Sequence, residues 1–306
     1  MLAIVIPFYK LTFFEETLQS LSIQTDKRFK VYIGDDASSE NPSVLLGKYK
    51  GQFDFMYHRF EENQGSLSLV QQWDRCIALT GEEEWLLVLC DDDTLSNTCI
   101  ADFYTCLPEI EGHDCKVIRF ASIINDVVQQ KVSALHTHPK LEKSTDFFCR
   151  RFKNQTRSSL SEYIFKKKAY QKYGFYNYEL AWYADDRAWL EFSEFKEIYS
   201  INSSYLSFRL SNQNISRDNY KTEIKEHIKI KFFKEFLIKN LLKFKRDQRH
   251  DLLLYYEQII YKQDRVNFTF WIDLFLLFIS NRDFLQSLKF TRRLLIFLNS
   301  KRIVNL

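Results

Sequence analysis

The aspartates of this sequence are the residues whose grouping is best suited to chemistry. Asp91, Asp92 and Asp93 follow the continuous apolar run Trp85 to Leu89, separated from it only by Cys90. Carboxylates packed this closely repel one another and raise each other's pKa values, and a bound divalent cation removes that repulsion. Carboxylate oxygens suit Mg²⁺ or Mn²⁺, whose coordination is usually completed by substrate phosphates. This group therefore predicts a site for a divalent metal and a diphosphate.

Two further acidic pairs belong to the same argument. Asp35 and Asp36 follow the segment Val31 to Gly34, and Asp185 and Asp186 stand at the start of a predicted helix. Each group also has a structural alternative, because acidic residues often cap helices or complement a helix dipole. The three groups together are more specific for a site than any one of them.

Strands that alternate with helices must position these carboxylates. Apolar runs predict five strands, at Ala3 to Ile6, Phe29 to Ile33, Phe53 to Tyr57, Trp85 to Leu89 and Val117 to Ile123. Helical spacing of apolar residues predicts helices that begin at Thr12 and span Ser66 to Leu79 and Asn97 to Leu107. Such alternation predicts an α/β fold with a mixed, mostly parallel sheet covered on both faces. Ligands bind beyond the carboxyl ends of strands in such sheets, so the groups at residues 35 and 91 point to one edge.

The middle of the chain is less regular. The polar segment Ile124 to Ser144 predicts a loop that carries His136 and His138 in solvent. Beyond it we expect a strand at Leu160 to Phe165, a helix at Lys166 to Tyr173, a helix at Asp185 to Phe195 and a strand at Ile198 to Leu210.

The last part of the chain changes character. Lys221 to Lys245 predicts one long basic helix, and further helices follow. We therefore expect an α/β domain at residues 1–218 and a helical subdomain at residues 219–306. Basic and apolar residues alternate in these helices, which fits either contact with an anionic membrane or an ordinary subdomain with solvated charges.

Taken in order, several short segments resemble the inverting family 2 glycosyltransferases, which have the GT-A fold. The first strand and donor loop of that family are similar to Ile4-Val5-Ile6-Pro7-Phe8-Tyr9. Its D-D-G-S segment is similar to Gly34-Asp35-Asp36-Ala37-Ser38, and its N-x-G turn is similar to Asn63-Gln64-Gly65. Its D-x-D motif is similar to Asp91-Asp92-Asp93. The E-D segment of the family is similar to Ala184-Asp185-Asp186, which Trp189 follows. The segment that often closes the domain is similar to Arg209-Leu210-Ser211 with Asn214-Ile215-Ser216. The resemblance covers about residues 1–216.

Three departures from the family pattern are visible. Ala37 stands where the family usually has glycine, and Asp185 stands in place of glutamate. The helix that usually carries A-R-N has Gln71 to Arg75 instead, which leaves the role of that helix open.

The resemblance implies transfer of a sugar from a nucleotide-diphosphate sugar, with a UDP-sugar favoured, to an acceptor hydroxyl with inversion. Asp186 would be the general base, with Asp185 as the alternative, and Asp91 and Asp93 would hold Mn²⁺ or Mg²⁺. The donor would be bound by Pro7, Tyr9, Asp35, Asp36, Asn63, Gly65, Asp92 and Arg209, with Asp36 at the uracil or ribose. The acceptor would be a glycan or a lipid-linked molecule of surface polysaccharide or glycan biosynthesis.

Composition narrows the class further. A formal net charge of +3 in 306 residues argues against a general polyanion binder, so we expect no nucleic-acid partner. The sequence starts without a basic leader and cleavage site, and the run Phe268 to Ile279 is shorter than the about 20 apolar residues that span a bilayer. We therefore expect a cytoplasmic protein, with peripheral contact at the inner face of a membrane as the alternative.

Two other kinds of enzyme also use clustered carboxylates and divalent ions. A nucleotidyltransferase would usually have a Gly- and Lys-rich phosphate loop near the first strand, which this chain lacks, and a nuclease would have a basic stripe beside the acids. A third alternative is a non-catalytic nucleotide- or sugar-binding module on a degenerate glycosyltransferase domain. Such a module would have lost a metal or base carboxylate, whereas all three acidic groups are present here.

Overall fold

The computed structural model describes residues 1–212, 222–261, 268–281 and 284–304. The chain divides into two compact units, Met1–Lys225 and Glu226–Leu306. The boundary expected between residues 218 and 219 lies outside the described residues, as do Asn214, Ile215 and Ser216.

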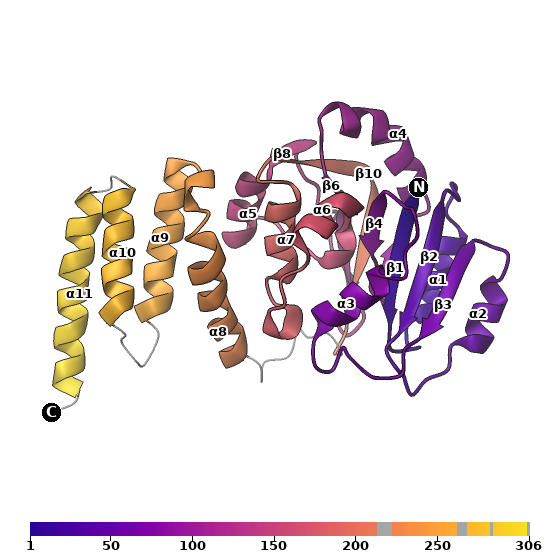
Figure 1. Ribbon diagram of the computed structural model, residues 1–306, viewed down its shortest axis with the longest axis horizontal. Helices are drawn as coiled ribbons and strands as arrows, with labels where there is room; N and C mark the ends of the chain where they lie inside the picture. Colours follow the sequence, from indigo (N-terminus) through magenta and orange to yellow (C-terminus); the bar gives the residue numbers. More distant parts are fainter. Residues whose placement is uncertain (213–221, 262–267, 282–283, 305–306) are drawn as a thin grey trace. The chain divides into compact units, whose positions relative to one another are not determined.

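The first unit is built on one mixed sheet (Figure 1). Its strands in spatial order are β3 (Asp54–Arg59), β2 (Phe29–Asp35), β1 (Leu2–Phe8), β4 (Trp85–Val88), β9 (Tyr163–Lys166), β6 (Val117–Asp126), β10 (Glu197–Leu210) and β5 (Thr94–Leu95). The first four strands are parallel to one another, and β6 is parallel to β10. Strand β9 runs antiparallel between β4 and β6, and β5 runs antiparallel to β10. The prediction of a mixed, mostly parallel sheet is therefore confirmed.

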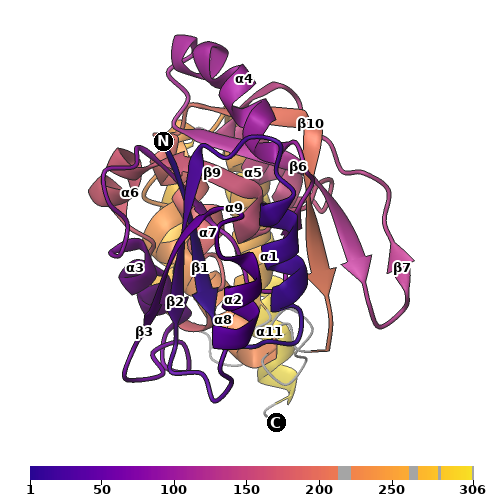
Figure 2. The same cartoon turned by 90° about the vertical axis from the view of Figure 1, so that its right-hand side faces the viewer.

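Side-chain alternation in the central strands creates two apolar faces. Leu2, Ile4 and Ile6 of β1 belong to one buried cluster with residues of α1 (Phe14–Ser22), α2 (Ser43–Tyr49) and α4 (Cys99–Gly112). Figure 2 shows α1 and α2 side by side, in agreement with their contacts. Successive strand residues point to opposite faces, so Ala3 and Val5 face the other side, where α3 (Leu69–Ile77) packs against β1 and β2.

A cluster of aromatic rings packs the later helices on β9. Trp189 of α7 (Ala184–Phe192) stacks on Tyr163 with 4.1 Å between ring centroids. The ring centroids of Phe165 and Phe192 are 5.2 Å apart. Trp189 is fully buried. Contacts of α7 with α5 (Ser144–Phe152) and α6 (Lys167–Tyr173) complete this layer. The ring cluster therefore fixes the helix on which Asp185 and Asp186 lie.

Several local expectations were wrong. Helix α1 begins at Phe14, and no side chain caps it, because Thr12 lies before the N-cap residue Phe13. The segment Leu160–Glu162 is a 3₁₀ turn, η1, so that β9 begins only at Tyr163. The expected loop after Ile124 contains the end of β6 and the short strands β7 (Lys131–Val132) and β8 (Leu141–Lys143), which pair with β6 and β10.

His138 is the largest departure within that segment. Its side chain is only 5% exposed, against the solvated position expected, because the main chain of His138 exchanges two hydrogen bonds with the Asn202 side chain of β10. Burial, followed by the nearby charges of Arg119 and Arg150, lowers the pKa of His138 to about 3. The ring is therefore a neutral part of the core at physiological pH.

The second unit is helical. It contains α8 (Thr222–Phe232) from Glu226 on, a π-helical turn (Phe233–Leu237), a 3₁₀ turn (Leu241–Lys243), α9 (Arg246–Tyr261), α10 (Phe268–Ser280) and α11 (Phe284–Val304). The single helix expected for Lys221 to Lys245 is thus interrupted at Phe233, where the ring stacks on Tyr256 of α9. In the part of the chain that the structure describes, no helix combines the length and the apolar character needed to cross a membrane.

Candidate active site

The turn between β4 and β5 carries Asp91, Asp92 and Asp93. Asp91 Oδ2 accepts hydrogen bonds from the backbone N–H groups of Tyr9 (2.8 Å) and Lys10 (3.0 Å), which follow β1. The Asp91 carbonyl also accepts a 3.0 Å bond from the Thr17 hydroxyl of α1. Burial raises the pKa of Asp91 to about 6, although the two backbone N–H groups oppose that effect. Asp91 therefore joins the acidic turn to the end of the central strand.

Asp93 is the most deeply buried of the three, at 1% exposure. Its Oδ1 accepts a 2.9 Å bond from the backbone N–H of Arg209, whereas among the described residues Oδ2 has no hydrogen-bond partner. Burial first, and then the charge of Asp92, raise the pKa of Asp93 to about 8. A buried carboxylate oxygen without a partner is costly, so this atom is suited to meet a proton, a cation or a ligand.

The donor atoms of Cys90, Asp92 and Asp93 lie within 4.8 Å of one another, which makes this group the best fit for a metal ion among the described residues. Burial raises the pKa of the Cys90 thiol well above its ordinary value, so the thiol stays neutral and is a poor ligand for a hard cation. Asp92 and Asp93 therefore provide the suitable oxygens. The family resemblance implied Asp91 and Asp93 as ligands, but the Asp91 carboxylate does not belong to this group.

Arg209 closes the turn from the other side. Its Nε donates a 2.9 Å bond to the carbonyl of Asp92, and another guanidinium nitrogen pairs with Glu16 of α1. The guanidinium also lies 4.2 Å from the centre of the Phe13 ring. At 5% exposure, Arg209 is built into the support of the acidic turn. Phe13 and Glu16 escaped the sequence analysis, since neither belongs to a short motif.

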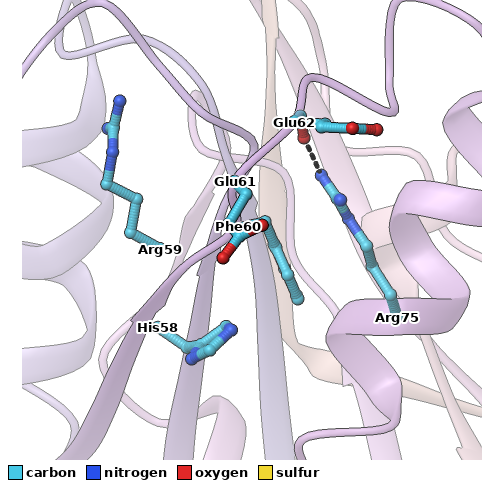
Figure 3. Close-up of a pocket in the computed structure, with 6 residues that line it drawn as sticks. All are labelled: His58, Arg59, Phe60, Glu61, Glu62 and Arg75. Atoms are coloured by element: carbon cyan, nitrogen blue, oxygen red, sulfur yellow. Dashed lines mark hydrogen bonds between the residues drawn. The ribbon is translucent and has the colours of Figure 1, made fainter.

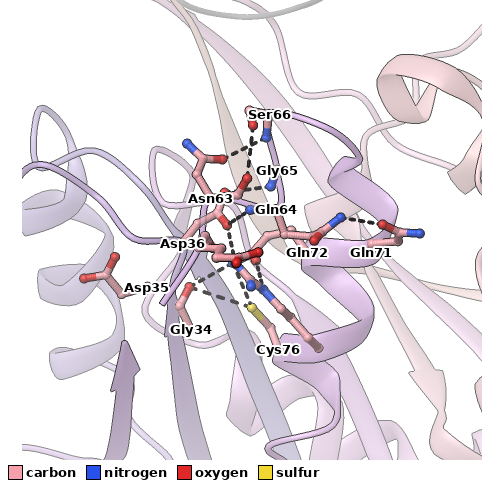
Figure 4. Close-up of polar contacts among 12 residues, drawn as sticks. Gly34, Asp35, Asp36, Asn63, Gln64, Gly65, Ser66, Gln71, Gln72 and Cys76 are labelled. Atoms are coloured by element: carbon pink, nitrogen blue, oxygen red, sulfur yellow. Dashed lines mark hydrogen bonds and ion pairs between the residues drawn. The ribbon is translucent and has the colours of Figure 1, made fainter. Parts of the chain in front are cut away.

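Asp35 and Asp36 end β2 and are both buried. Asp35 accepts bonds from the backbone N–H of Ser38 at 2.8 Å, from the Tyr57 hydroxyl and from Arg59 at 2.9 Å. Asp36 accepts bonds from the backbone N–H groups of Gln64 (2.7 Å) and Gly65 (2.9 Å) and pairs with Arg75. Figure 4 shows Asp36 among these contacts. The two carboxylates thus hold the carboxyl ends of β2 and β3 together.

Helix α3 has a role that the sequence left open. Arg75 pairs with Asp36, donates a 2.8 Å bond to the carbonyl of Glu62 and lies 3.9 Å from the centre of the Phe60 ring. Gln72 donates a 3.1 Å bond to the carbonyl of Gly34. A Cβ on Gly34 would lie 2.3 Å from the Cys76 sulfur, so glycine is what lets α3 approach β2 this closely. The sequence feature that could have indicated this role is an arginine, Arg75, on the helix that follows the N-x-G-like turn.

A hollow lies beside this ion pair (Figure 3). It is lined by His58, Arg59, Phe60, Glu61, Glu62 and Arg75. Two of its cations, Arg59 and Arg75, are those that pair with Asp35 and Asp36. The hollow therefore combines two arginines, two glutamates and an aromatic ring at the carboxyl ends of β2 and β3.

The remaining predicted donor residues lie along the same edge. Pro7 is half-buried in β1 next to Gly34 of β2, and Tyr9 is 40% exposed just beyond the strand. The Tyr9 carbonyl accepts a 2.6 Å bond from the Ser38 hydroxyl. Asn63 uses its side-chain oxygen within its own turn, where it accepts a 2.8 Å bond from the backbone N–H of Ser66. The structure thus brings β1, β2 and the 63–65 turn together at one edge.

Asp185 and Asp186 lie in the first turn of α7. Asp186 is 8% exposed, and among the described residues its Oδ1 has no hydrogen-bond partner. Burial raises the pKa of both carboxyls, that of Asp185 to about 7 with the charge of Asp186 as the second cause. The nearby guanidinium of Arg151, which was not predicted, lowers the pKa of Asp186 in part. A carboxyl poised near neutral pH is suited to accept a proton.

The backbone before α7 is strained. Leu180, Ala181 and Tyr183 have φ values of 56°, 54° and 68°, in the left-handed region that side chains other than glycine rarely adopt. Such strain costs of order 1–3 kcal/mol for each residue and is often found at functional sites.

The 3₁₀ turn η1 contacts the start of the acidic turn through a hydrogen bond. The Ser161 hydroxyl accepts a 3.0 Å bond from the backbone N–H of Cys90. Its neighbour Glu162 is fully buried and pairs with Arg157, whose charge partly lowers the pKa of Asp93. The support from Ser161 had no recognisable signal in the sequence, because its partner Cys90 lies 71 residues away.

Comparisons with known proteins rest on the fold. No protein-family model matches the sequence, and no curated protein sequence does either. Crystal structures of S. aureus TarS, however, are similar over most of this chain. The full TarS structure matches with a TM-score of 0.58 and 15% identity over 86% of this chain. The chain shares the fold of TarS.

Two structures of TarS 1-349 give the same result. The complex with UDP matches with a TM-score of 0.53 and 15% identity over 85% of this chain and 80% of TarS 1-349. The complex with UDP-GlcNAc matches with a TM-score of 0.55 and 14% identity over 84% of this chain and 81% of TarS 1-349. This chain spans only 44% of the full TarS chain.

Gly65 should tolerate no side chain. A Cβ at Gly65 would lie 2.5 Å from Asp36 Oδ2, so Gly65→Ala should displace the carboxylate and lower the melting temperature, with a loss of roughly 1–3 kcal/mol of stability. Gly47→Ala is the matched control, because a Cβ there meets nothing within 4 Å and alanine favours the helix by up to about 1 kcal/mol. Thermal unfolding followed by circular dichroism measures both. Equal effects of the two substitutions would contradict the packing described for Asp36.

Asp93 should make stability depend on pH in metal-free buffer. The native state keeps the Asp93 proton up to about pH 8, whereas the unfolded chain releases it near 3.8. The contribution of Asp93 is thus complete below pH 4 and is lost as the pH rises towards 8. Asp93→Asn cannot ionise, so in EDTA its melting temperature should exceed that of the wild type at pH 8, by at least about 2 °C, and the excess should shrink towards pH 5.

The control for this prediction is Asp114→Asn, whose side chain is 70% exposed. It should leave the pH dependence of melting unchanged. A constant difference between Asp93→Asn and wild type from pH 5 to pH 8 would show that the Asp93 carboxyl ionises normally.

Proposed function

We propose that this chain is a metal-dependent, inverting glycosyltransferase of family 2 with the GT-A fold, which uses a nucleotide-sugar donor. The observation that carries the proposal is the pair of buried, unpartnered carboxylate oxygens, Asp93 Oδ2 and Asp186 Oδ1, on a fold shared with TarS. TarS has been crystallised with UDP and with UDP-GlcNAc, which makes a UDP-sugar the favoured donor.

The donor site of the proposal lies along the carboxyl ends of β1, β2 and β4. Asp36 with Arg75, the 63–65 turn and the exposed Tyr9 would surround the nucleoside. Asp35 and Arg209 act less directly, because both side chains are committed to contacts that support this edge. Pro7 would shape the strand end beneath the donor.

The metal site of the proposal is the β4–β5 turn. Asp92 and Asp93 fit Mn²⁺ or Mg²⁺, since both offer carboxylate oxygens close together and Asp93 Oδ2 has no other partner among the described residues. A bound ion would stabilise the negative charge of the diphosphate leaving group. Asp91 would act through the backbone of Tyr9 and Lys10, by holding the turn against β1.

Asp186 is the proposed general base. Its raised pKa and unpartnered Oδ1 suit it to take the proton of the acceptor hydroxyl as that oxygen attacks the anomeric carbon. Burial also raises the pKa of Asp185, to about 7, and Asp185 remains the alternative base. The strained turn before α7 would keep both carboxylates at the start of the helix. The acceptor would be a hydroxyl of a glycan or of a lipid-linked molecule.

Donor binding can be tested without knowledge of the acceptor. UDP and UDP-GlcNAc with Mn²⁺ should raise the melting temperature, because a ligand at about 100 times its dissociation constant stabilises a fold by roughly 2.7 kcal/mol. The shift should disappear in EDTA and in Asp93→Ala, and it should persist in the control Asp114→Asn. A panel of other nucleoside diphosphates tests the choice of uridine. No shift with any nucleotide would refute the proposal of a donor site.

Catalysis should depend on Asp186 more than binding does. With UDP-GlcNAc and Mn²⁺, release of UDP by slow transfer to water should fall about 10²–10⁴-fold in Asp186→Asn, while the melting shift with UDP stays the same. Asp185→Asn measured in the same way decides between the two carboxylates, and Glu191→Gln, on the same helix, is the control. Wild-type UDP release in both aspartate variants would show that neither carboxylate is the base, whereas no UDP release by the wild type would favour a non-catalytic binding module.

A further inference from the structure

Helix α11 presents an unusual outer face. Between Phe284 and Asn299 the exposed positions recur at helical spacing, and five of them carry large apolar side chains. Their exposed fractions are 66% for Phe284, 73% for Leu285, 70% for Leu288, 58% for Leu295 and 59% for Ile296. A concentration of exposed leucine, isoleucine and phenylalanine on one helix is more than the scattered apolar residues of an ordinary protein surface.

The opposite face of α11 already has a partner within its own unit. Phe290 is 1% exposed and packs on Trp271 and Phe278 of α10, with ring centroids 5.8 Å and 5.6 Å apart. The outer apolar face is therefore not required for the packing of α11 on α10. A helix that is apolar on both faces is typical of one that is covered on both sides.

Charge indicates what covers the outer face. The segment Phe284–Val304 contains five basic residues and no Asp or Glu. Two of the basic residues, Lys289 and Arg292, are exposed among the apolar side chains. The whole second unit has 16 Lys and Arg residues and 8 Asp and Glu residues, which gives it a formal charge of +8. The first unit, Met1–Lys225, has 27 Lys and Arg residues and 32 Asp and Glu residues, which gives it a formal charge of −5. The partner of this face should therefore be both apolar and negatively charged.

A second copy of this chain does not fit that description. Two copies of α11 meeting through their outer faces would bring Lys289 and Arg292 against one another, and the helix has no acidic residue to pair with them. Like charges across an interface disfavour association. An anionic lipid surface offers both properties, because it accepts apolar side chains at the level of the acyl chains and attracts basic ones at the headgroups.

We propose that the outer face of α11 docks this protein on an anionic lipid surface. Leu285, Leu288 and Ile296 enter the boundary between headgroups and acyl chains, while Lys289 and Arg292 reach the lipid phosphates through their flexible stems. The helix lies along the surface. This interaction stands independently of the proposed transferase activity and is measured without any donor.

Vesicle sedimentation of the full chain tests the proposal. The protein should bind vesicles of phosphatidylcholine mixed with phosphatidylglycerol and should bind pure phosphatidylcholine much more weakly, and added salt should weaken the binding. Leu285→Ser/Leu288→Ser and Lys289→Glu/Arg292→Glu should each reduce partitioning into the mixed vesicles by at least roughly tenfold. Because all four side chains are exposed, circular dichroism should show native helix content and melting in both variants.

Two matched controls lie in the same unit but outside α11. Leu242→Ser removes an apolar side chain that is 84% exposed, and Lys239→Glu/Lys243→Glu reverses the same amount of exposed charge. Both should bind vesicles as the wild type does. An equal loss in Lys239→Glu/Lys243→Glu would show that binding follows net charge alone and would overturn the proposal.

Two other outcomes would also overturn the proposal. One is absence of binding to the mixed vesicles. The other is a concentration-dependent dimer in analytical ultracentrifugation that Leu285→Ser/Leu288→Ser dissociates, since that result would assign the face to a second copy of the chain.

Discussion

The burial of closely spaced carboxylates, together with their mutual repulsion, is the constraint on which the first unit depends. Seven aspartates are grouped after β2, after β4 and at the start of α7, and folding removes most of them from water. Such a concentration of charge is tolerable only where partners compensate it. Asp35 and Asp36 have arginine partners and backbone donors, and Asp91 has two backbone donors. The arrangement of β1, β2, β3 and α3 at this edge follows from the need to provide these donors.

The compensation is incomplete at two positions, Asp93 and Asp186. Asp93 and Asp186 are both buried, yet each keeps an oxygen that has no hydrogen-bond partner among the described residues. Their pKa values are raised as a consequence, chiefly by burial. A cation or a proton bound at these oxygens would relieve the cost of their burial, which is why we propose Asp93 as a metal ligand and Asp186 as a general base. Asp36, by contrast, has both of its carboxylate oxygens engaged by Arg75 and the 63–65 turn.

The two units of the chain differ in charge and in the use of apolar surface. The first unit carries the acidic edge and covers both faces of its sheet. The second unit is basic and leaves a row of large apolar side chains exposed on its last helix. Folding alone does not require that surface, since the core around Trp271 and Phe290 forms on the other face of the helix. A role in recognition of an apolar, anionic partner accounts for both features at once.

The sequence by itself determined the α/β class, most strands of the sheet and the edge at which the groups at residues 35 and 91 lie, because apolar runs that end in aspartates are local patterns. It did not determine which aspartate does what. Asp91 rather than Asp93 binds the end of β1, and Asp93 receives a donor from Arg209, 116 residues later. The role of Arg75, the burial of His138 and the interruption of the first C-terminal helix likewise depend on partners distant in the sequence. Tertiary structure decided these points because the free energy of a buried charge or ring depends on what surrounds it.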